Sequence, residues 1–131
     1  QCAKVIGIES VPEAIEAARE NAVFNQIENA FFEVGDMKDC FNDSFVEQHG
    51  KADVVITDPP RNGMHADVIK QLLKLAPPRI VYISCNSSTQ ARDLELMKEA
   101  YTVLKSQAVD MFPQTHHVEN VVLLQRNEIH E

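Results

Sequence analysis

The chain has 131 residues, of which 44% are hydrophobic and 24% are charged, and its net charge is −8. That length suits one domain with a buried core rather than two, and the composition is typical of a soluble globular protein. No apolar stretch approaches the roughly 20 residues of a membrane helix, and nothing at the start resembles a signal peptide. The acidic balance argues against strong nucleic-acid binding by the bare chain, because phosphate contacts need Lys and Arg. An RNA substrate would need a local basic surface or basic residues outside this sequence.

Three cysteines, Cys2, Cys40 and Cys85, are spread along the chain. None belongs to a CxxC or Cys/His pattern, so we expect no metal site. His116 and His117 are adjacent, which makes their side chains face apart, and we interpret them as part of a polar loop. Unpaired thiols are typical of a reducing cytoplasm, where we expect the protein to reside.

Short apolar stretches alternate with helical patterns along most of the chain. Strands are predicted at residues 4–9, 30–34, 52–57 and 79–84, and helices at 11–24, about 37–48, 66–76 and 87–101. Two more strands, at 103–112 and 118–125, follow with no helix between them. Ser10 with Glu13, and Ser87 with Gln90, have the spacing of a capping box, which predicts where the first and last helices begin.

This alternation of strands and helices predicts an α/β fold. We expect a mostly parallel sheet covered on both faces, with an antiparallel hairpin formed by the last two strands. Ligands of such sheets bind at the carboxyl ends of the strands. Four successive strand ends carry an acidic or reactive residue, namely Glu9, Asp36, Asp58 and Cys85. Four such ends are a stronger signal than any one alone.

An acid at the end of the first or second strand can have either of two roles. Glu9 could accept hydrogen bonds from ribose hydroxyls, as acids do in dinucleotide-type folds, or could favour the dipole of the next helix. Asp36 could bind an adenine amine or cap the helix after it. The residues alone leave these alternatives open.

Asp58, Pro59 and Pro60 form a more specific pattern. Two prolines remove backbone donors and fix the chain direction, which suits a wall beside a planar base. A plain strand-to-helix turn is the alternative, and the site is favoured because Arg61 and Gly63 come directly after the prolines.

Cys85 is a candidate nucleophile and Glu119 a candidate general base. Cys85 follows an apolar strand and precedes Asn86, where a helix begins, and a helix N-terminus promotes the reactive thiolate. The alternative is a buried small hydrophobic residue, the usual fate of a free cysteine. For Glu119 the alternative is a solvated or strand-edge carboxylate. A cysteine, a carboxylate and a strand-end Asp-Pro-Pro together indicate covalent chemistry on a flat, electron-poor ring.

Three segments of the chain resemble the signature regions of one family. DPPRNG (58–63), IVYISCNSST (80–89) and VDMFPQTHHVE (109–119) resemble, in order and over their full length, those of the RNA 5-methyluridine (uracil-C5) methyltransferases. The resemblance runs from about Val5 to Arg126. It implies a Rossmann-like sheet, S-adenosylmethionine as cofactor, and a uridine of ribosomal RNA or tRNA as substrate.

The same resemblance implies roles for individual residues. Cys85 would be the nucleophile, and Glu119 would remove the proton from C5 of the uracil. Glu9, Asp36 and Asp58 would be acids of the cofactor pocket. Because two signature regions match in register, the structural alternatives for Cys85 and Glu119 lose their weight.

The chain departs from the family in its glycines. It has four glycines and no Gly-x-Gly turn, and it starts at what corresponds to the second strand of the sheet. We therefore expect residues 1–131 to be a C-terminal fragment of the catalytic domain, without the first strand and the glycine-rich loop. Such a fragment is expected to be inactive alone and to self-associate.

Two other functions compete with this interpretation. Another nucleic-acid methyltransferase with a DPP motif, acting on an exocyclic amine, would prefer an aromatic residue where this chain has Arg61, and would need no cysteine. A non-catalytic remnant of the fold would need neither Cys85 nor Glu119.

Overall fold

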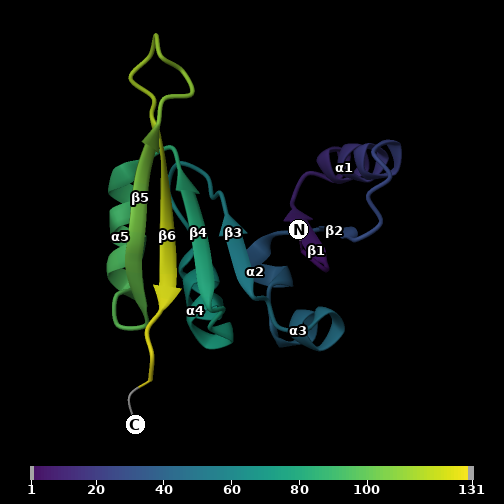
Figure 1. Ribbon diagram of the computed structural model, residues 1–131, viewed down its shortest axis with the longest axis horizontal. Helices are drawn as coiled ribbons and strands as arrows, with labels where there is room; N and C mark the ends of the chain where they lie inside the picture. The colour runs from purple at the N-terminus through teal and green to yellow at the C-terminus, as the bar shows by residue number, and fades with distance from the viewer. Residues whose placement is uncertain (1, 130–131) are drawn as a thin grey trace. The chain divides into compact units, whose positions relative to one another are not determined.

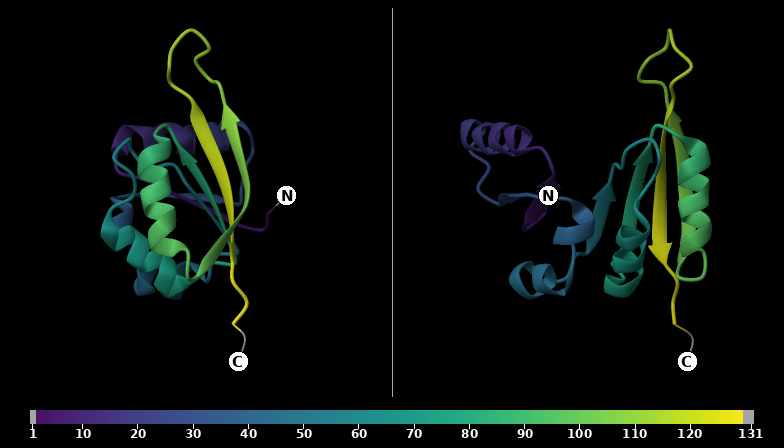
Figure 2. Two further views of the ribbon diagram at one scale, coloured as in Figure 1. Left: turned by 90° about the vertical axis from the view of Figure 1, so that its left-hand side faces the viewer. Right: turned by 180° about the vertical axis from the view of Figure 1, so that it is seen from behind.

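The structure is a computed structural model that describes residues 2–129. The chain divides into two compact units, Gln1–Phe45 and Val46–Glu131. Figure 1 and Figure 2 show the helices and strands of each unit. Within residues 2–129, no helix combines the length and the hydrophobicity that crossing a membrane requires.

The first unit is built on a strand–helix–strand motif. β1 (Val5–Glu9) and β2 (Ala30–Val34) form a two-stranded parallel sheet, and α1 (Pro12–Phe24) connects them. Ile15 and Ala22 are the buried residues of α1. Their spacing of two helical turns places both on the face that packs toward the strands. The predicted strands and helix of this segment are confirmed.

The predicted capping box of Ser10 and Glu13 does not form. The N-cap of α1 is Val11, which makes no side-chain cap bond, and proline stands in the first turn. Glu9 takes over this role, because its Oε1 accepts hydrogen bonds from Val11 N at 3.0 Å and from Ser10 Oγ at 3.2 Å. The prediction was wrong because Ser10 lies before the cap position.

Two short helices replace the single helix predicted over 37–48. α2 (Met37–Cys40) and α3 (Asp43–His49) are separated by Phe41 and Asn42. Asn42 Nδ2 donates to Asp39 O at 2.8 Å, and Asn42 Oδ1 accepts from Phe45 N at 3.0 Å. The Asn42 side chain therefore interrupts the helix by bonding to backbone groups on either side of it.

The second unit contains a four-stranded sheet in the order β3-β4-β6-β5. Its strands are β3 (Val54–Thr57), β4 (Arg79–Ser84), β5 (Tyr101–Val109) and β6 (Glu119–Arg126), and its helices are α4 (Ala66–Leu75) and α5 (Ser87–Met97). β3 and β4 are parallel, whereas β6 is antiparallel to both β4 and β5. The predicted antiparallel hairpin at the end of the chain is thus confirmed.

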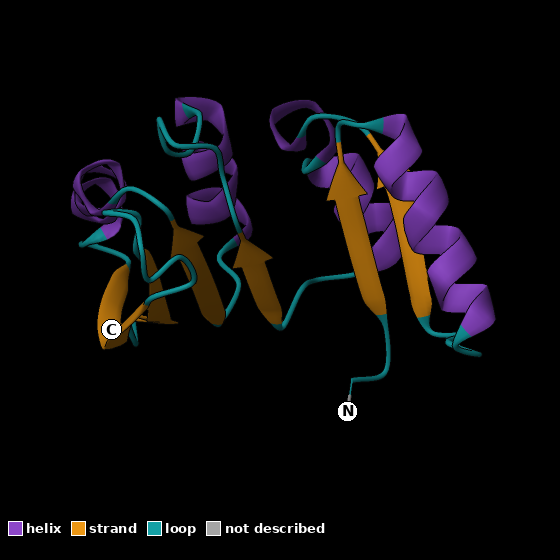
Figure 3. Ribbon diagram, turned by 90° about the horizontal axis from the view of Figure 1, so that it is seen from above, coloured by secondary structure: helices purple, strands orange, loops and turns teal. Residues whose placement is uncertain are grey.

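Both α4 and α5 lie on the same face of this sheet, as Figure 3 shows. Side chains of β4 alternate across the sheet, and Ile80 and Tyr82 on the helix side are 0% exposed. On the other side, Val54 and Ile56 of β3 are 49% and 69% exposed. Within the described part of this unit, then, the sheet does not have the two covered faces that the apolar strands predicted.

Tyr101 begins β5 instead of ending the last helix as predicted. α5 ends at Met97, and the Tyr101 side chain is only 4% exposed. Its hydroxyl donates a hydrogen bond to Pro77 O at 2.8 Å. Burial raises the pKa of this phenol. This long-range packing fixes Tyr101 in the strand, and helical spacing along the sequence does not report it.

Candidate active site

The register of β4 and β6 brings Cys85 and Glu119 together. The antiparallel pairing advances one residue at a time and ends with Ser84 opposite Asn120. Cys85 is the residue directly after the end of β4, and Glu119 is the first residue of β6. The candidate nucleophile and the candidate base are thus at the same end of the β4–β6 ladder, each one residue beyond its last pair.

Neither of these two side chains makes a hydrogen bond within the described residues. Cys85 and Glu119 are both half-buried. Cys85 is also a free cysteine. Glu119 lies on the side of the sheet away from α4 and α5, because side chains alternate along β6 and that of Val122 is on the helix side.

The turn after Cys85 is fixed by serine and asparagine side chains. Ser84 Oγ donates to Asn86 O at 2.9 Å and accepts from Asn86 N at 3.0 Å. Asn86 is the N-cap of α5, since its Oδ1 accepts from Ser88 N and Thr89 N. Cys85 therefore directly precedes a helix N-terminus, as predicted. The capping box predicted at Ser87 is wrong, because the cap is one residue earlier.

Asp58 lies at the same end of the sheet as Cys85, where the parallel strands β3 and β4 both finish. β3 is parallel to β4 and pairs Thr57 with Tyr82, so the two strands end side by side. The Asp58 side chain is exposed and has no hydrogen bond or ion pair within the described residues. A carboxylate in that state is available to a ligand.

Backbone carbonyls hold the loop after Asp58 against α5. Arg61 O accepts from Thr89 Oγ1 at 2.9 Å, and Asn62 O accepts from Arg92 Nη2 at 2.8 Å. The Arg61 guanidinium lies 3.2 Å from His117 Nδ1 and can donate to it. The three segments singled out by the sequence, 58–63, 80–89 and 109–119, are thus joined by direct contacts.

Asp93 is a buried acid that the sequence analysis missed. It is 0% exposed, and its Oδ2 accepts from Met64 N at 2.8 Å and from the Tyr82 hydroxyl at 2.7 Å. Arg92 Nη2 binds the other oxygen, Oδ1, at 2.8 Å. Burial, followed by this hydrogen bond to Asp93, raises the pKa of Tyr82. Asp93 therefore ties the loop after β3 to β4 and α5.

Gln90 is a second buried polar residue that was missed. It is 2% exposed and bonds to Tyr82 of β4 and Asn120 of β6. The buried residues of α5 are Gln90, Asp93 and Met97. Hydrophobic periodicity does not identify a buried helix face that contains a glutamine and an aspartate, although the two residues have helical spacing.

Glu9 and Asp36 lie in the first unit, at the carboxyl ends of two paired parallel strands. Glu9 Oε1 accepts from Val11 N and Ser10 Oγ, and these bonds, that of Val11 first, lower the pKa of the exposed carboxyl. Asp36 Oδ1 accepts from Lys38 N at 3.0 Å, which makes Asp36 the N-cap of α2. Asp36 therefore has the capping role that was its alternative, and Glu9 lies just before the N-terminus of α1, as its alternative expected. Each also keeps one carboxylate oxygen without a partner in residues 2–129.

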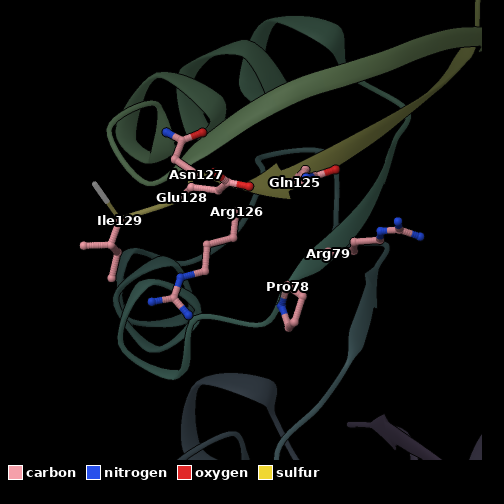
Figure 4. A pocket seen from close by; sticks show the side chains of 7 residues that line it. All are labelled: Pro78, Arg79, Gln125, Arg126, Asn127, Glu128 and Ile129. Atoms are coloured by element: carbon pink, nitrogen blue, oxygen red, sulfur yellow. The ribbon is translucent and has the colours of Figure 1, made fainter. Parts of the chain in front are cut away.

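A surface pocket of about 490 Å³ lies at the other end of the second unit's sheet, shown in Figure 4. It is lined by the start of β4 and by residues at and after the end of β6. Cys85 and Glu119 are at the opposite ends of these strands. The pocket is thus separate from the candidate site, and no residue proposed for that site lines it.

The histidines of the hairpin loop pack together instead of diverging. The rings of His116 and His117 are 4.2 Å apart between centroids and tilted by 36°. Within residues 2–129, no three His, Cys, Asp or Glu side chains are grouped as metal ligands would be.

Both units carry acidic or reactive residues at the carboxyl ends of parallel strands, which is where α/β folds bind their ligands, and the fold comparison makes this class more specific. The N-methyltransferase NodS of Bradyrhizobium japonicum, solved in complex with S-adenosyl-L-homocysteine, superposes with a TM-score of 0.71 over 97% of this chain and 68% of that one. At 14% identity this likeness shows the fold alone. The fold is that of the Rossmann-like methyltransferases.

The chain belongs to the tRNA (uracil-5-)-methyltransferase family, whose model matches residues 2–127. An uncharacterised RNA methyltransferase of Porphyromonas gingivalis is 63% identical over 129 residues, which are 97% of this chain and 28% of that protein. The tRNA (uracil-54, C5)-methyltransferase of Pyrococcus abyssi, crystallised with S-adenosyl-L-homocysteine, is 41% identical, with a TM-score of 0.78. That match covers 92% of this chain and 28% of the other. The chain therefore spans about 28% of the length of these relatives, and the resemblance found in the sequence is confirmed.

Proposed function

We propose that the chain forms part of the catalytic domain of an enzyme that methylates C5 of a uridine in RNA, with S-adenosylmethionine as the methyl donor. Membership of the uracil-5 family supports the reaction class. The observation that supports the mechanism is the register of β4 and β6, because Cys85 and Glu119 each lie one residue beyond the last pair at the same end of that ladder.

Cys85 is the nucleophile in this proposal. C5 of uracil is too weak a nucleophile to take a methyl group unaided, so covalent catalysis divides one difficult step into two easier ones. The Cys85 thiolate forms a bond from Sγ to C6, and the electrons of the C5–C6 double bond move onto C5 and the O4 carbonyl. C5 would then be enolate-like and would attack the methyl carbon of S-adenosylmethionine, whose carbon–sulfur bond would break with the electron pair left on sulfur. In a duplex or folded RNA the target base must first leave its stack.

Glu119 is the base that completes the reaction. After methylation, C5 still carries its hydrogen, and the Glu119 carboxylate takes that proton. The electron pair left behind restores the C5–C6 double bond, and the bond from C6 to Cys85 Sγ breaks. The thiolate is regenerated and 5-methyluridine leaves. A half-buried carboxylate without a partner in the described structure is free to accept this proton.

The acids at the strand ends suit the cofactor. S-adenosylmethionine supplies a methyl group on a positively charged sulfur, and the rest of the molecule offers ribose hydroxyls and an adenine amine. Glu9 and Asp36 each keep a carboxylate oxygen free to accept hydrogen bonds from such groups. The unpartnered Asp58 is suited to the reaction side of the pocket, and Pro59 and Pro60 bring no donor of their own. These carboxylate acceptors thus match the hydrogen-bond donors that the cofactor offers.

The RNA class follows from the family alone. The Pyrococcus abyssi relative acts on uracil 54 of tRNA, and the family carries the name of tRNA. We propose a uridine of tRNA or ribosomal RNA as the substrate. Arg61, whose guanidinium lies 3.2 Å from His117 Nδ1 beside the candidate site, is the basic residue that we propose for contact with an RNA phosphate.

The test is release of tritium from C5-labelled uridine RNA by protein of the relatives' full length. Cys85→Ala is expected to abolish release, because without the thiolate C5 is never activated. Cys40→Ala, which removes the half-buried thiol of the first unit, is the matched control and should keep wild-type activity. Turnover by Cys85→Ala near the wild-type level would remove Cys85 from the mechanism and favour a methyltransferase that uses no cysteine.

A further inference from the structure

Gln90 of α5 joins the two strands that carry the candidate nucleophile and base. Its Nε2 donates to Tyr82 O of β4 at 3.0 Å and to Asn120 O of β6 at 3.2 Å. Its Oε1 accepts from Asn120 Nδ2 at 2.7 Å. Both amide protons and the carbonyl of a 2% exposed side chain are therefore satisfied. We call this set of three bonds the Gln90 clasp.

The clasp buries a polar amide, which is energetically costly, and it does so at the end of the sheet that carries Cys85 and Glu119. Burying an amide is unfavourable unless each polar atom finds a partner, so a leucine would fill this helix position more cheaply. Gln90 is instead held at the first turn of α5, a few residues after Cys85, and its partner Asn120 directly follows Glu119. The bonds act where β4 ends and β6 begins.

The two reacting residues are held in different ways. The turn at Cys85 has its own bonds through Ser84 and Asn86. Glu119 is the first residue of β6 and pairs with Val109 of β5 through its backbone, but its side chain has no partner in the described structure. Among residues 2–129, the Asn120 side chain binds Ser106 Oγ of β5, at 3.2 Å, besides Gln90. The clasp therefore adds a side-chain link from the start of β6 to β4 and α5.

We infer that Gln90 is a positioning residue for the base: through Asn120 it fixes where Glu119 stands relative to the C6 adduct on Cys85. This inference rests on the proposed function. It assigns Gln90 to proton removal and thiol elimination, and not to thiol addition or methyl transfer. A displacement of about 1 Å at a reacting group can cost on the order of a hundredfold in rate.

The experiment separates these steps with two RNAs and protein of the relatives' full length. With 5-fluorouridine RNA, thiol addition and methyl transfer proceed, but the fluorine cannot leave as a cation, so the complex is trapped and reports only the early steps. With ordinary C5-tritiated RNA, tritium release reports the base step. Gln90→Leu keeps the volume and removes the clasp. Gln71→Leu, the same change at a partly buried glutamine of α4 whose Oε1 has no partner, is the matched control.

For Gln90→Leu we expect trapping within about twofold of wild type but tritium release slower by about tenfold or more. The methylated covalent complex with ordinary RNA should then accumulate. Asn120→Ala, which removes one of the three bonds, should change the ratio of the two rates in the same direction by less. Assays run well below the melting temperature of each variant, measured in parallel, exclude unfolding as the cause.

Two outcomes overturn the inference. If Gln90→Leu lowers trapping and release by the same factor, or behaves like Gln71→Leu, the clasp is structural only. Absence of trapping in the wild-type protein would instead contradict the proposed function itself, so the two failures are distinguishable.

Discussion

Glu119 is the first residue of β6, and its carboxylate has no partner among the described residues. If it removes the C5 proton, Glu119→Gln keeps the size of the side chain and loses the base. We expect tritium release to fall by about a hundredfold or more, with a covalent RNA–protein complex through Cys85 that survives a denaturing gel. Glu128→Gln, at an exposed position after β6, should behave as wild type. An inactive Glu119→Gln variant without any adduct would mean that Glu119 acts before methyl transfer or only in folding.

At the scale of the residue, the sequence points to candidate reactive groups but not to the buried residues that support them. Cys85 and Glu119 could be chosen because nucleophiles and bases belong to few residue types and because they ended or began apolar runs. Gln90 and Asp93 could not be chosen, since a polar residue in a helix is normally solvent-facing. Only the fold shows that these two are 2% and 0% exposed. Glu9 and Asp36 are intermediate cases, because the capping role and the ligand role use the same carboxylate.

The loop between β3 and α4 depends on a close approach at Gly63. Its φ is +87°, and a Cβ there would lie 2.5 Å from Arg92 Nη2 and 2.7 Å from Asp93 Oδ2. Gly50 has the same φ of +87° but open space where a Cβ would be. Both Gly→Ala changes therefore carry the backbone strain of about 1–2 kcal/mol, and Gly63→Ala adds a clash with a buried, hydrogen-bonded carboxylate.

Urea unfolding of the two variants isolates the clash. We expect Gly63→Ala to lower the free energy of unfolding by about 1–3 kcal/mol more than Gly50→Ala. We also expect Gly63→Ala alone to weaken activity, because the loop carries Asp58 to the sheet edge near Cys85. Equal losses in the two variants would show that the contact of this loop with Arg92 and Asp93 contributes nothing to stability.

At the scale of the element, periodicity located the strands and the hairpin but not every boundary. The last two strands were predicted at 103–112 and 118–125 and are Tyr101–Val109 and Glu119–Arg126. The helix predicted over 37–48 is broken by hydrogen bonds of Asn42 that no hydrophobic pattern encodes. The position of β6 between β4 and β5, which creates the site, follows from long-range pairing that no local signal announces.

Each of the two sheets has a strand with a free edge. Within residues 2–129, β1 pairs only with β2, and β3 only with β4. Val54 and Ile56 of β3 are 49% and 69% exposed, and an exposed apolar edge strand invites pairing with another chain. We therefore expect the 131-residue chain by itself to self-associate with rising concentration in light scattering, and Ile56→Lys to reduce this. A monomer at all concentrations would contradict this prediction.

The cofactor should bind weakly to the 131-residue chain by itself. Glu9, Asp36 and Asp58 can supply acceptors for the ribose, adenine and reaction side. However, the chain has four glycines and no Gly-x-Gly turn to present backbone amides to the methionine portion. Calorimetric titration with S-adenosylmethionine should give a dissociation constant well above the micromolar range. Micromolar binding by a monomeric chain would show that residues 1–131 contain a complete cofactor site.

The most direct test of the mechanism is to map the covalent complex formed with 5-fluorouridine RNA. Protein of the relatives' full length is incubated with this RNA and S-adenosylmethionine, digested, and analysed by mass spectrometry. The proposed mechanism predicts one cross-linked peptide, with the methylated fluorouracil attached to the Cys85 sulfur, and no adduct in Cys85→Ala. An adduct on Cys2 or Cys40, or active protein that forms no adduct at all, would contradict it.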